Sequence, residues 1–342
     1  MNVRNPARAA RRRWWIVLVA TALAAGTALV SSATWATIDD AGERVLTACI
    51  AALIGLVIGL VGALVIDSLD DTVRGERDLQ ADIDGQSPPP VLAVVPVEPT
   101  PTGRAATVAA PEGRVAEIYE ALGRNLHVVG LHRPARIIQI TSSLPGEGST
   151  TTVADLAVGL ARSGHSVAAV DADLRKPALH RLFATPPVPG LADILQGESV
   201  DFVAVPLSLP GGVDLVLVPA GDTAERPSGV LSGTRWHEVI HGLAQRFDSV
   251  LVDSAAVLPS DDAMALADVV DAVLLVVRAD RTSWSDVVES VGRLRASGCF
   301  VGGFVLTQAK RGAPGRFLAE RLRGDAEALG SATIAQQGGP GA

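Results

Sequence analysis

A glycine-rich loop between a predicted strand and a predicted helix is the feature that most constrains the fold of this chain. The apolar run at residues 136–141 predicts the strand, and apolar side chains at helical spacing predict a helix over residues 150–162. The glycine loop between them, residues 143–149, reads SLPGEGS. This order of strand, loop and helix is typical of a phosphate-binding loop, and it predicts an α/β fold around a nucleotide site.

The backbone amides of the glycine loop and the positive end of the following helix predict a binding site for phosphate groups. The residues expected to bind the nucleotide are Pro145, Gly146, Glu147, Gly148, Ser149, Thr150 and Thr151. A Walker A loop reads GxxxxGK(S/T), and Ser149 stands where its lysine would reach the phosphates, while Thr150 stands at the Mg²⁺-binding position. The sequence therefore predicts ATP or ADP with Mg²⁺ as the ligand, with weakened binding.

Acidic residues follow two further predicted strands. Asp171 and Asp173 come at the end of one apolar run, and Asp253 ends another. Because ligands of parallel α/β sheets bind at the carboxyl ends of the strands, these carboxylates are expected near the phosphates. Asp171 and Asp173 are the predicted catalytic pair, and Thr150, Asp171 and Asp253 are predicted to hold Mg²⁺ through water. The alternative is that these aspartates are solvated or helix-capping carboxylates.

Apolar runs alternate with helical patterns from residue 135 onward. They predict strands at residues 136–141, 166–171, 213–218, 249–253, 272–277 and 300–307, with a further short strand at 91–97 and a helix at 112–129. Strands that alternate with helices predict a parallel sheet covered by helices on both faces. The expected fold class is therefore a parallel-sheet α/β domain.

Two long apolar segments without a charged residue precede this domain, at residues 14–35 and 45–66. Each is long enough to cross a bilayer as a helix, which needs roughly 20 apolar residues. Arginines before the first segment and after the second predict that both chain termini lie in the cytoplasm. The sequence thus predicts a multi-pass protein of the cell membrane. A cleaved signal peptide is the alternative interpretation of the first segment.

These features divide the chain into four predicted parts. They are a membrane anchor with a short external loop at residues 1–84, a Pro/Gly-rich linker at 85–113, the α/β domain at 114–312, and a C-terminal helix with a disordered tail at 313–342. In the second span, small residues recur at Ala51, Gly55, Gly59 and Ala63. This stripe predicts close packing with the first span or with another subunit, although glycine is also common in membrane helices.

The net charge of −8, with no basic stripe outside the N-terminus, argues against nucleic acid as the main partner.

Several motifs together resemble those of one family, the bacterial tyrosine autokinases and polysaccharide chain-length determinants. The motifs are IDSLDDTVRGERDLQ at residues 66–80, SSLPGEGSTTT at 142–152, VDADLRKPALHRLF at 170–183, ERPSGVLSG at 225–233 and VDAVLLVVRADRT at 270–282. The resemblance implies a P-loop NTPase fold like that of the partitioning ATPases, and ATP-dependent protein-tyrosine kinase activity. It also implies partners among the inner-membrane proteins that assemble or export a surface polysaccharide.

The chain departs from the family pattern at positions that matter for phosphoryl transfer. The family loop reads GEGKST where this chain has Ser149, and the family's DTPP is replaced by DSAA, which begins at Asp253. The family's tyrosine tail is absent, since Tyr119 is the only tyrosine. The departures predict a pseudokinase with weak or lost activity, acting as a nucleotide-responsive or purely structural partner. Arg175 or Lys176 is the candidate substitute for the missing lysine.

Two alternative functions remain open. An active kinase that phosphorylates another protein would use the intact pair Asp171 and Asp173. A membrane-tethered ATPase of the partitioning type would position other proteins, but Leu144 stands where the second lysine of that class would fall.

Overall fold

A computed structural model of the chain describes residues 50, 53–54, 56–57, 71–83, 85–97, 105–126, 135–197, 204–207, 215–222 and 227–310. The chain divides into two compact units, Met1–Asp71 and Thr72–Ala342. Nearly all of the two predicted spans, the whole small-residue stripe and the tail after residue 310 lie outside the described residues. No helix among the residues described here combines the length and the apolar character needed to cross a membrane.

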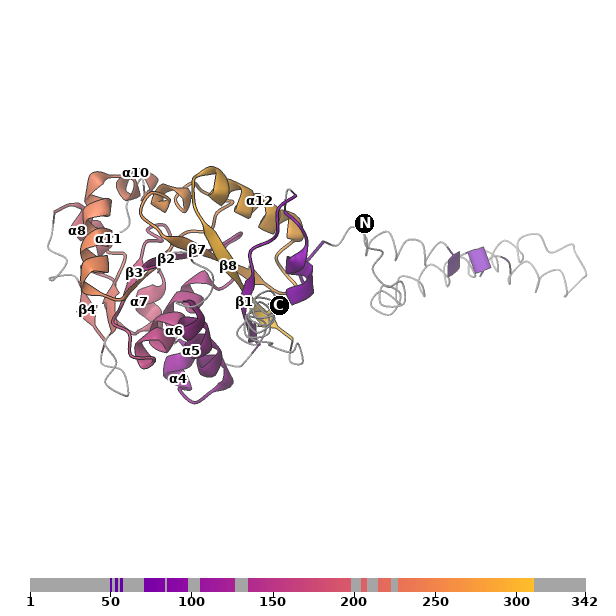
Figure 1. Ribbon diagram of the computed structural model, residues 1–342, viewed down its shortest axis with the longest axis horizontal. Helices are drawn as coiled ribbons and strands as arrows, with labels where there is room; N and C mark the ends of the chain where they lie inside the picture. Colours follow the sequence, from indigo (N-terminus) through magenta and orange to yellow (C-terminus); the bar gives the residue numbers. More distant parts are fainter. Residues whose placement is uncertain are drawn as a thin grey trace, which may run out of the picture. The chain divides into compact units, whose positions relative to one another are not determined.

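The second unit is built on one sheet of eight strands in the order β1-β8-β7-β2-β6-β3-β5-β4 (Figure 1). Neighbouring strands are parallel except β4 and β5, which are antiparallel. The strands are β1 (Val91–Pro96), β2 (Ile137–Ser142), β3 (Val167–Asp171), β4 (Val205–Pro206), β5 (Leu215–Val218), β6 (Ser249–Asp253), β7 (Ala272–Arg278) and β8 (Val301–Ala309). The predicted parallel α/β fold is confirmed. Every predicted strand is found, and of the strands that the structure describes only the short β4 was not predicted.

Helices cover both faces of this sheet, as Figure 1 shows. One face packs against α4 (Ala106–Ala109), α5 (Arg114–Leu126), α6 (Ser149–Arg162) and α7 (Leu179–Leu182). The other packs against α8 (Leu191–Leu195), α10 (Pro227–Leu231), α11 (Thr234–Arg246), α12 (Trp284–Ala296) and the short 3-10 helices η1 (Glu76–Gln80) and η2 (Met264–Leu266). Because both faces are covered, the central strands β2, β3 and β6 are buried along their whole length.

Two polar side chains inside β2 fix the segment that follows β6. The Gln139 amide nitrogen donates hydrogen bonds to the Ser254 hydroxyl (2.8 Å) and to the Ala263 carbonyl (2.9 Å). The Thr141 hydroxyl donates to the Ala255 carbonyl (2.8 Å). Buried polar groups are stable when they are hydrogen-bonded, so these contacts hold the loop after β6 against the centre of the sheet.

The segment directly after residue 71 belongs to the second unit. Val73, Leu79 and Ile83 are buried in the same apolar cluster as α12, and the Val73 amide donates to the Thr282 carbonyl (2.8 Å). The region predicted as a Pro/Gly-rich linker, residues 85–113, contributes β1 and α4 to this unit. The boundaries of the predicted parts remain a prediction.

Helices α5 and α6 cross at a glycine. A Cβ atom added to Gly159 would lie 2.8 Å from the Tyr119 backbone carbon and 2.9 Å from the Glu120 nitrogen, so only glycine fits there. This close approach lets the Tyr119 hydroxyl lie 3.2 Å from the Thr152 hydroxyl. Further along α6, the buried Asp155 carboxylate accepts hydrogen bonds from the Thr107 amide (2.8 Å) and hydroxyl (2.9 Å). The start of α6 is therefore held rigidly by its neighbours.

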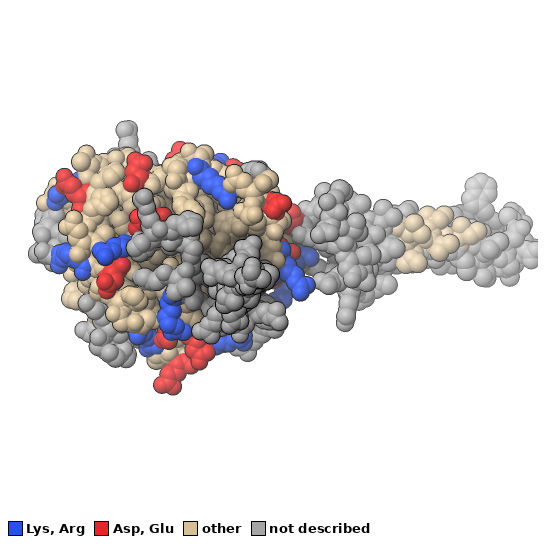
Figure 2. All heavy atoms as spheres, in the orientation of Figure 1, with Lys and Arg blue, Asp and Glu red and all other residues tan. Residues whose placement is uncertain are grey.

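Basic and acidic side chains are interspersed over the face of the second unit seen in Figure 2. On that face the charges of one sign are not gathered into one patch. The charges that a bound ligand would meet are therefore those of the individual side chains that line the cavities.

Candidate functional site

The glycine loop joins β2 directly to α6. Gly146 has a φ of 83° and Gly148 a φ of 107°, in a region of backbone conformation that favours glycine. The Thr152 amide donates to the Gly148 carbonyl (2.9 Å), so the first turn of α6 forms immediately after the second glycine. The structure therefore has the strand, loop and helix in the order that the sequence predicts for a phosphate-binding loop.

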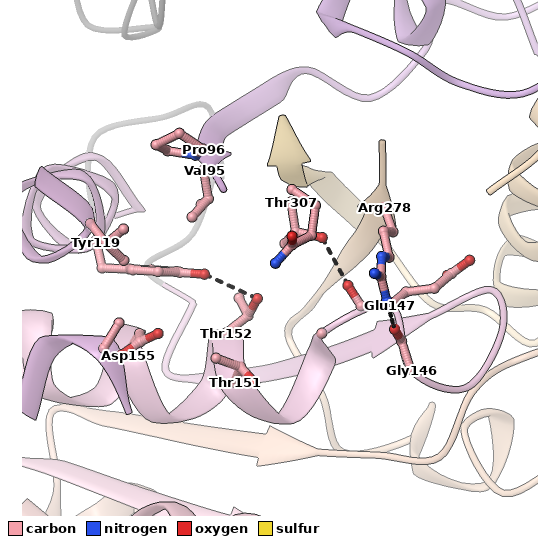
Figure 3. A pocket seen from close by; sticks show the side chains of 14 residues that line it. Val95, Pro96, Tyr119, Gly146, Glu147, Thr151, Thr152, Asp155, Arg278 and Thr307 are labelled. Carbon is pink, nitrogen blue, oxygen red and sulfur yellow. Dashed lines mark hydrogen bonds between the residues drawn. The ribbon is translucent and has the colours of Figure 1, made fainter. Parts of the chain in front are cut away.

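Glu147 braces the glycine loop from within. Its buried carboxylate accepts hydrogen bonds from the Leu144 amide (3.1 Å) and from the Thr282 hydroxyl (2.5 Å). The Thr307 hydroxyl donates to the Glu147 carbonyl (2.8 Å), as Figure 3 shows. Burial raises the pKa of Glu147, while the hydrogen bonds that its carboxylate accepts from Thr282 and Leu144 lower it. The Glu147 side chain thus holds the loop in shape, and only its backbone is available to a phosphate.

Two arginines at the end of β7 contact the same loop: Arg278 is the last residue of the strand, and Arg281 follows it. The Arg278 guanidinium donates to the Gly146 carbonyl (2.9 Å), and that of Arg281 donates to the Pro145 carbonyl (3.4 Å) (Figure 3 shows the first contact). The sequence analysis did not identify these arginines or Thr282 as site residues. They stand at or just after the end of a buried strand, at the same edge of the sheet as Asp171 and Asp253, so the strand-end argument could have found them.

A cavity of about 510 Å³, the larger cavity, opens between the glycine loop and the ends of β3 and β6. It is lined by Ser149 and Thr150 of the loop, by Asp173 and Lys176 after β3, and by residues between 255 and 262 after β6. The structure therefore brings three segments that the sequence singled out around one space.

Asp171 and Asp253 lie side by side as paired residues at the ends of β3 and β6, and neither is among the residues that line this cavity. Both are fully buried. One Asp171 oxygen accepts hydrogen bonds from the amides of Ala178 (3.1 Å) and Leu179 (3.0 Å), and the other has no partner. Burial, with a smaller contribution from Asp173, raises the pKa of Asp171 to about 7 despite these amides. One of its oxygens is thus left without a hydrogen bond at the edge of the candidate site.

Neither carboxylate oxygen of Asp253 has a hydrogen bond of ordinary length and angle within the described chain, although the Thr150 hydroxyl lies near enough to favour the ionised form of this carboxyl. Burial above all, and then the neighbouring Asp171, raise the pKa of Asp253 well above its usual range, with Thr150 acting in the opposite direction. Buried oxygens without partners are rare in native proteins and fit a position completed by a bound cation. The described residues contain no cluster of three or more His, Cys, Asp or Glu side chains that could hold a metal alone. Mg²⁺ in phosphate sites is usually held by one or two carboxylates together with the phosphates, and this donor set fits that pattern.

Asp173, the other member of the predicted catalytic pair, caps the turn after β3. One oxygen accepts hydrogen bonds from the backbone amides of Arg175 (3.2 Å) and Lys176 (3.0 Å). The capping alternative therefore describes Asp173 and one oxygen of Asp171, and the catalytic roles of both residues stay a prediction.

A second, smaller cavity of about 250 Å³ borders the same loop. Its lining includes Glu147, Gly148 and Thr151 of the predicted nucleotide-binding residues, with Tyr119 and Asp155 beside them (Figure 3). Gly146 borders both cavities, whereas Pro145, Ser149 and Thr150 border only the larger one. Burial raises the pKa of Asp155 to about 6 and, together with Asp155, raises that of Tyr119. The predicted nucleotide-binding residues are thus divided between two spaces.

Comparison with known proteins gives a consistent picture. No protein-family model matches the chain. It is 32% identical over 172 residues to the tyrosine-protein kinase YwqD of Bacillus subtilis, a match that covers 50% of this chain and 72% of YwqD. It is 34% identical over 157 residues to the succinoglycan biosynthesis transport protein ExoP of Rhizobium meliloti, covering 43% of this chain but only 19% of ExoP. The solved kinase domain of the Escherichia coli tyrosine kinase ETK is similar with a TM-score of 0.60 at 26% identity, covering 66% of this chain and 92% of that domain.

Proposed function

The chain belongs to the family of bacterial tyrosine autokinases and polysaccharide chain-length determinants, and from this premise we propose that it is a membrane-anchored, kinase-like nucleotide-binding protein of surface polysaccharide biosynthesis or export. The name of ExoP refers to biosynthesis and transport of a polysaccharide, and that of YwqD to a tyrosine kinase. The match spans most of YwqD but about a fifth of ExoP, so activity and partners are part of the proposal.

The observation that carries the proposal is Ser149 in the first turn of α6, beside the larger cavity. Catalysis of phosphoryl transfer depends on positioning and on stabilising charge on the transferring group. The loss of one preorganised donor typically costs about 10²–10³ in rate. A serine here keeps the shape of the loop but supplies no charge, and it supports a protein that binds nucleotide and has weak or lost kinase activity.

The remaining groups retain the parts of a nucleotide site. The loop amides would bind the phosphates, and the Thr150 hydroxyl with Asp171 and Asp253 would hold Mg²⁺ through water. When bound, the metal ion neutralises charge on the phosphate oxygens. Because the raised pKa values of Asp171 and Asp253 favour their protonated forms, both carboxylates would release protons as they accept the metal.

The proposed location is the cell membrane, with spans at residues 14–35 and 45–66 and both termini in the cytoplasm. The apolar length and flanking arginines of these segments support it. The proposed partners are inner-membrane proteins of polysaccharide assembly or export, and further copies of this chain packed through Ala51, Gly55, Gly59 and Ala63.

The test compares the full 342-residue chain with its Ser149→Lys variant in Mg-ADP binding and in ATP-dependent phosphorylation of a tyrosine-containing copolymer. We expect the wild type to bind Mg-ADP and to transfer phosphate at least about 100-fold more slowly than the lysine variant. Equal and rapid transfer by both proteins would contradict the pseudokinase.

The second candidate is an active kinase that phosphorylates another protein. It is favoured by the position of Asp171 at the end of β3, where one carboxylate oxygen has no hydrogen bond and burial raises the pKa to about 7, which suits a general base at neutral pH. Under this alternative the wild type transfers phosphate to a partner protein, and Asp171→Asn abolishes the transfer while Mg-ADP binding persists.

A further inference from the structure

The larger cavity carries few positive charges for a site that would bind phosphates. Asp173, Asp261 and Asp262 line it, and among the described residues of its lining the only cations are Arg175 and Lys176. Ser149 contributes none. Mg²⁺ can neutralise part of the charge of a nucleoside diphosphate or triphosphate, but the position of the loop lysine is left without a positive side chain. Either Arg175 or Lys176 would have to supply the positive charge that contacts the phosphate groups.

Arg175 is already engaged. Its guanidinium donates two parallel hydrogen bonds to the Asp262 carboxylate, one from Nε and one from a terminal nitrogen. Asp262 is buried, and the pairing raises the pKa of Arg175. A turn of Arg175 toward a phosphate would leave a buried carboxylate without its partner, which is strongly unfavourable. Arg175 therefore has a structural role: its ion pair with Asp262 joins the loop after β3 to the loop after β6.

Arg278 and Arg281 also approach the glycine loop, but neither lines the larger cavity. Their guanidinium groups donate to the carbonyl oxygens of Gly146 and Pro145. They stabilise the loop and are not placed to replace its lysine.

Lys176 is exposed, and its ammonium group has no ion pair or hydrogen bond to the described part of the chain. Its backbone amide donates to the Asp173 carboxylate (3.0 Å), which fixes the base of the side chain at the cavity. Lysine carries a point charge on a flexible four-carbon stem and binds phosphate in this form. The other lysine of the sequence, Lys310, pairs with Asp280 (2.9 Å).

We propose that Lys176 binds the phosphate groups of the nucleotide in place of the missing loop lysine. This inference rests on the proposed function, since it presumes that the larger cavity accepts a nucleotide. Of the two candidate substitutes that the sequence offers, Arg175 and Lys176, we therefore assign the role to Lys176.

The first experiment is calorimetric titration of the full chain with Mg-ADP. We expect Lys176→Ala to weaken binding at least about tenfold and Lys310→Ala, the matched control, to leave it unchanged. Adding Ser149→Lys to the Lys176→Ala variant should restore the affinity, because the lysine then reaches the phosphates from the loop. Circular dichroism melting checks that the variants are folded.

The second experiment uses an acyl-phosphate derivative of ATP. A lysine amine near the phosphates attacks the acyl carbon, an amide forms, and the nucleotide leaves. Because the sequence contains only Lys176 and Lys310, peptide mass spectrometry can assign the label to one side chain. We expect labelling at Lys176 that excess Mg-ADP prevents, and labelling at Lys310 that Mg-ADP does not affect.

The outcomes separate this inference from the function on which it rests. If the wild type binds Mg-ADP and Lys176→Ala binds equally well, the role of Lys176 is wrong and the nucleotide site stands. If the wild type fails to bind and Ser149→Lys binds, then nucleotide binding itself is lost in this protein, and both proposals fall. Protection of Lys310 in place of Lys176 would also overturn the inference.

Discussion

The two sides of the glycine loop differ in how their polar groups are satisfied. On the side of the smaller cavity, the Glu147 carboxylate, the Thr282 and Thr307 hydroxyls and the Arg278 guanidinium all have hydrogen-bond partners. At the ends of β3 and β6, one oxygen of Asp171 and both oxygens of Asp253 have no hydrogen bond of ordinary geometry within the described chain. The polar groups of the first side are satisfied within the protein, as in a structural element. Those of the second side are left unpaired, as in a site that binds a ligand.

The serine at position 149 affects the two sides of the glycine loop differently. The side chain of Ser149 makes none of the contacts of the bonded side, so these contacts do not depend on which side chain stands at position 149. On the side with unpaired carboxylates, Ser149 does not supply the positive charge that a loop lysine would supply. A chain can therefore keep the structure of a phosphate-binding loop while its affinity and reactivity change.

The largest effect is expected from breaking the bonded side with Glu147→Ala. The Leu144 amide and the Thr282 hydroxyl would lose their acceptor, and each buried unpaired donor costs about 1–3 kcal/mol. We expect the free energy of unfolding to fall by about 4 kcal/mol, measured by denaturant unfolding. The control is Glu147→Gln, which keeps one acceptor oxygen and should cost less than half as much. Equal stability of Glu147→Ala and wild type would show that the loop does not depend on this brace.

A smaller effect of opposite sign is expected from Asp155→Asn beside the smaller cavity. An asparagine oxygen can accept both hydrogen bonds from Thr107 and carries no charge to bury. The folded-state pKa of Asp155, about 6, exceeds its usual value of 3.8, so the protein loses stability as pH rises from about 4 to 6 and loses no more above that range. At about 1.4 kcal/mol per pKa unit, the penalty approaches 3 kcal/mol at pH 7.

We therefore expect Asp155→Asn to raise the melting temperature at pH 7 and to leave it almost unchanged at pH 4, measured by thermal unfolding at both values. A variant that is less stable than wild type at pH 7 would mean that the Asp155 charge is useful to the fold.

Much of the scaffold follows from sequence because its causes are local. The runs that form β2, β3, β6 and β7 are largely apolar, and the glycines at 146 and 148 supply the positive φ values of the loop. The two residues of β4 are too few to produce a pattern. Asp171 and Asp253 could be placed together because parallel strands end at one edge of the sheet.

The bracing contacts could not be predicted in the same way, because they join residues far apart in the chain. Glu147 meets Thr282 and Thr307, and Arg175 meets Asp262, only after the strands have taken their order in the sheet. The sequence assigned Glu147 to phosphate binding and left Arg175 open as a substitute cation. Tertiary contacts commit both side chains to structure.

The side with unpaired carboxylates should respond to pH through its ligand. Mg²⁺ binds ionised carboxylates, and the Asp171 pKa is about 7, so the ionised fraction falls about tenfold between pH 8 and pH 6. We expect Mg-ADP binding to weaken at least about tenfold over that interval, equivalent to about 1.4 kcal/mol or more because Asp253 must also lose its proton, in calorimetric titrations. Titration with ADP in EDTA is the control and should vary little. Equal pH dependence with and without Mg²⁺ would remove Asp171 from the metal site.

The smallest effects are expected at the two arginines, and they sharpen the comparison because the two contacts differ in length. Arg278 donates to the Gly146 carbonyl at 2.9 Å, whereas Arg281 reaches the Pro145 carbonyl at 3.4 Å. An exposed contact of good geometry contributes about 1 kcal/mol, and a longer one contributes less. We expect Arg278→Ala to lower the free energy of unfolding by about 1 kcal/mol and Arg281→Ala by less than about 0.5 kcal/mol, measured in denaturant. The reverse order would mean that the Arg281 side of the loop carries the brace.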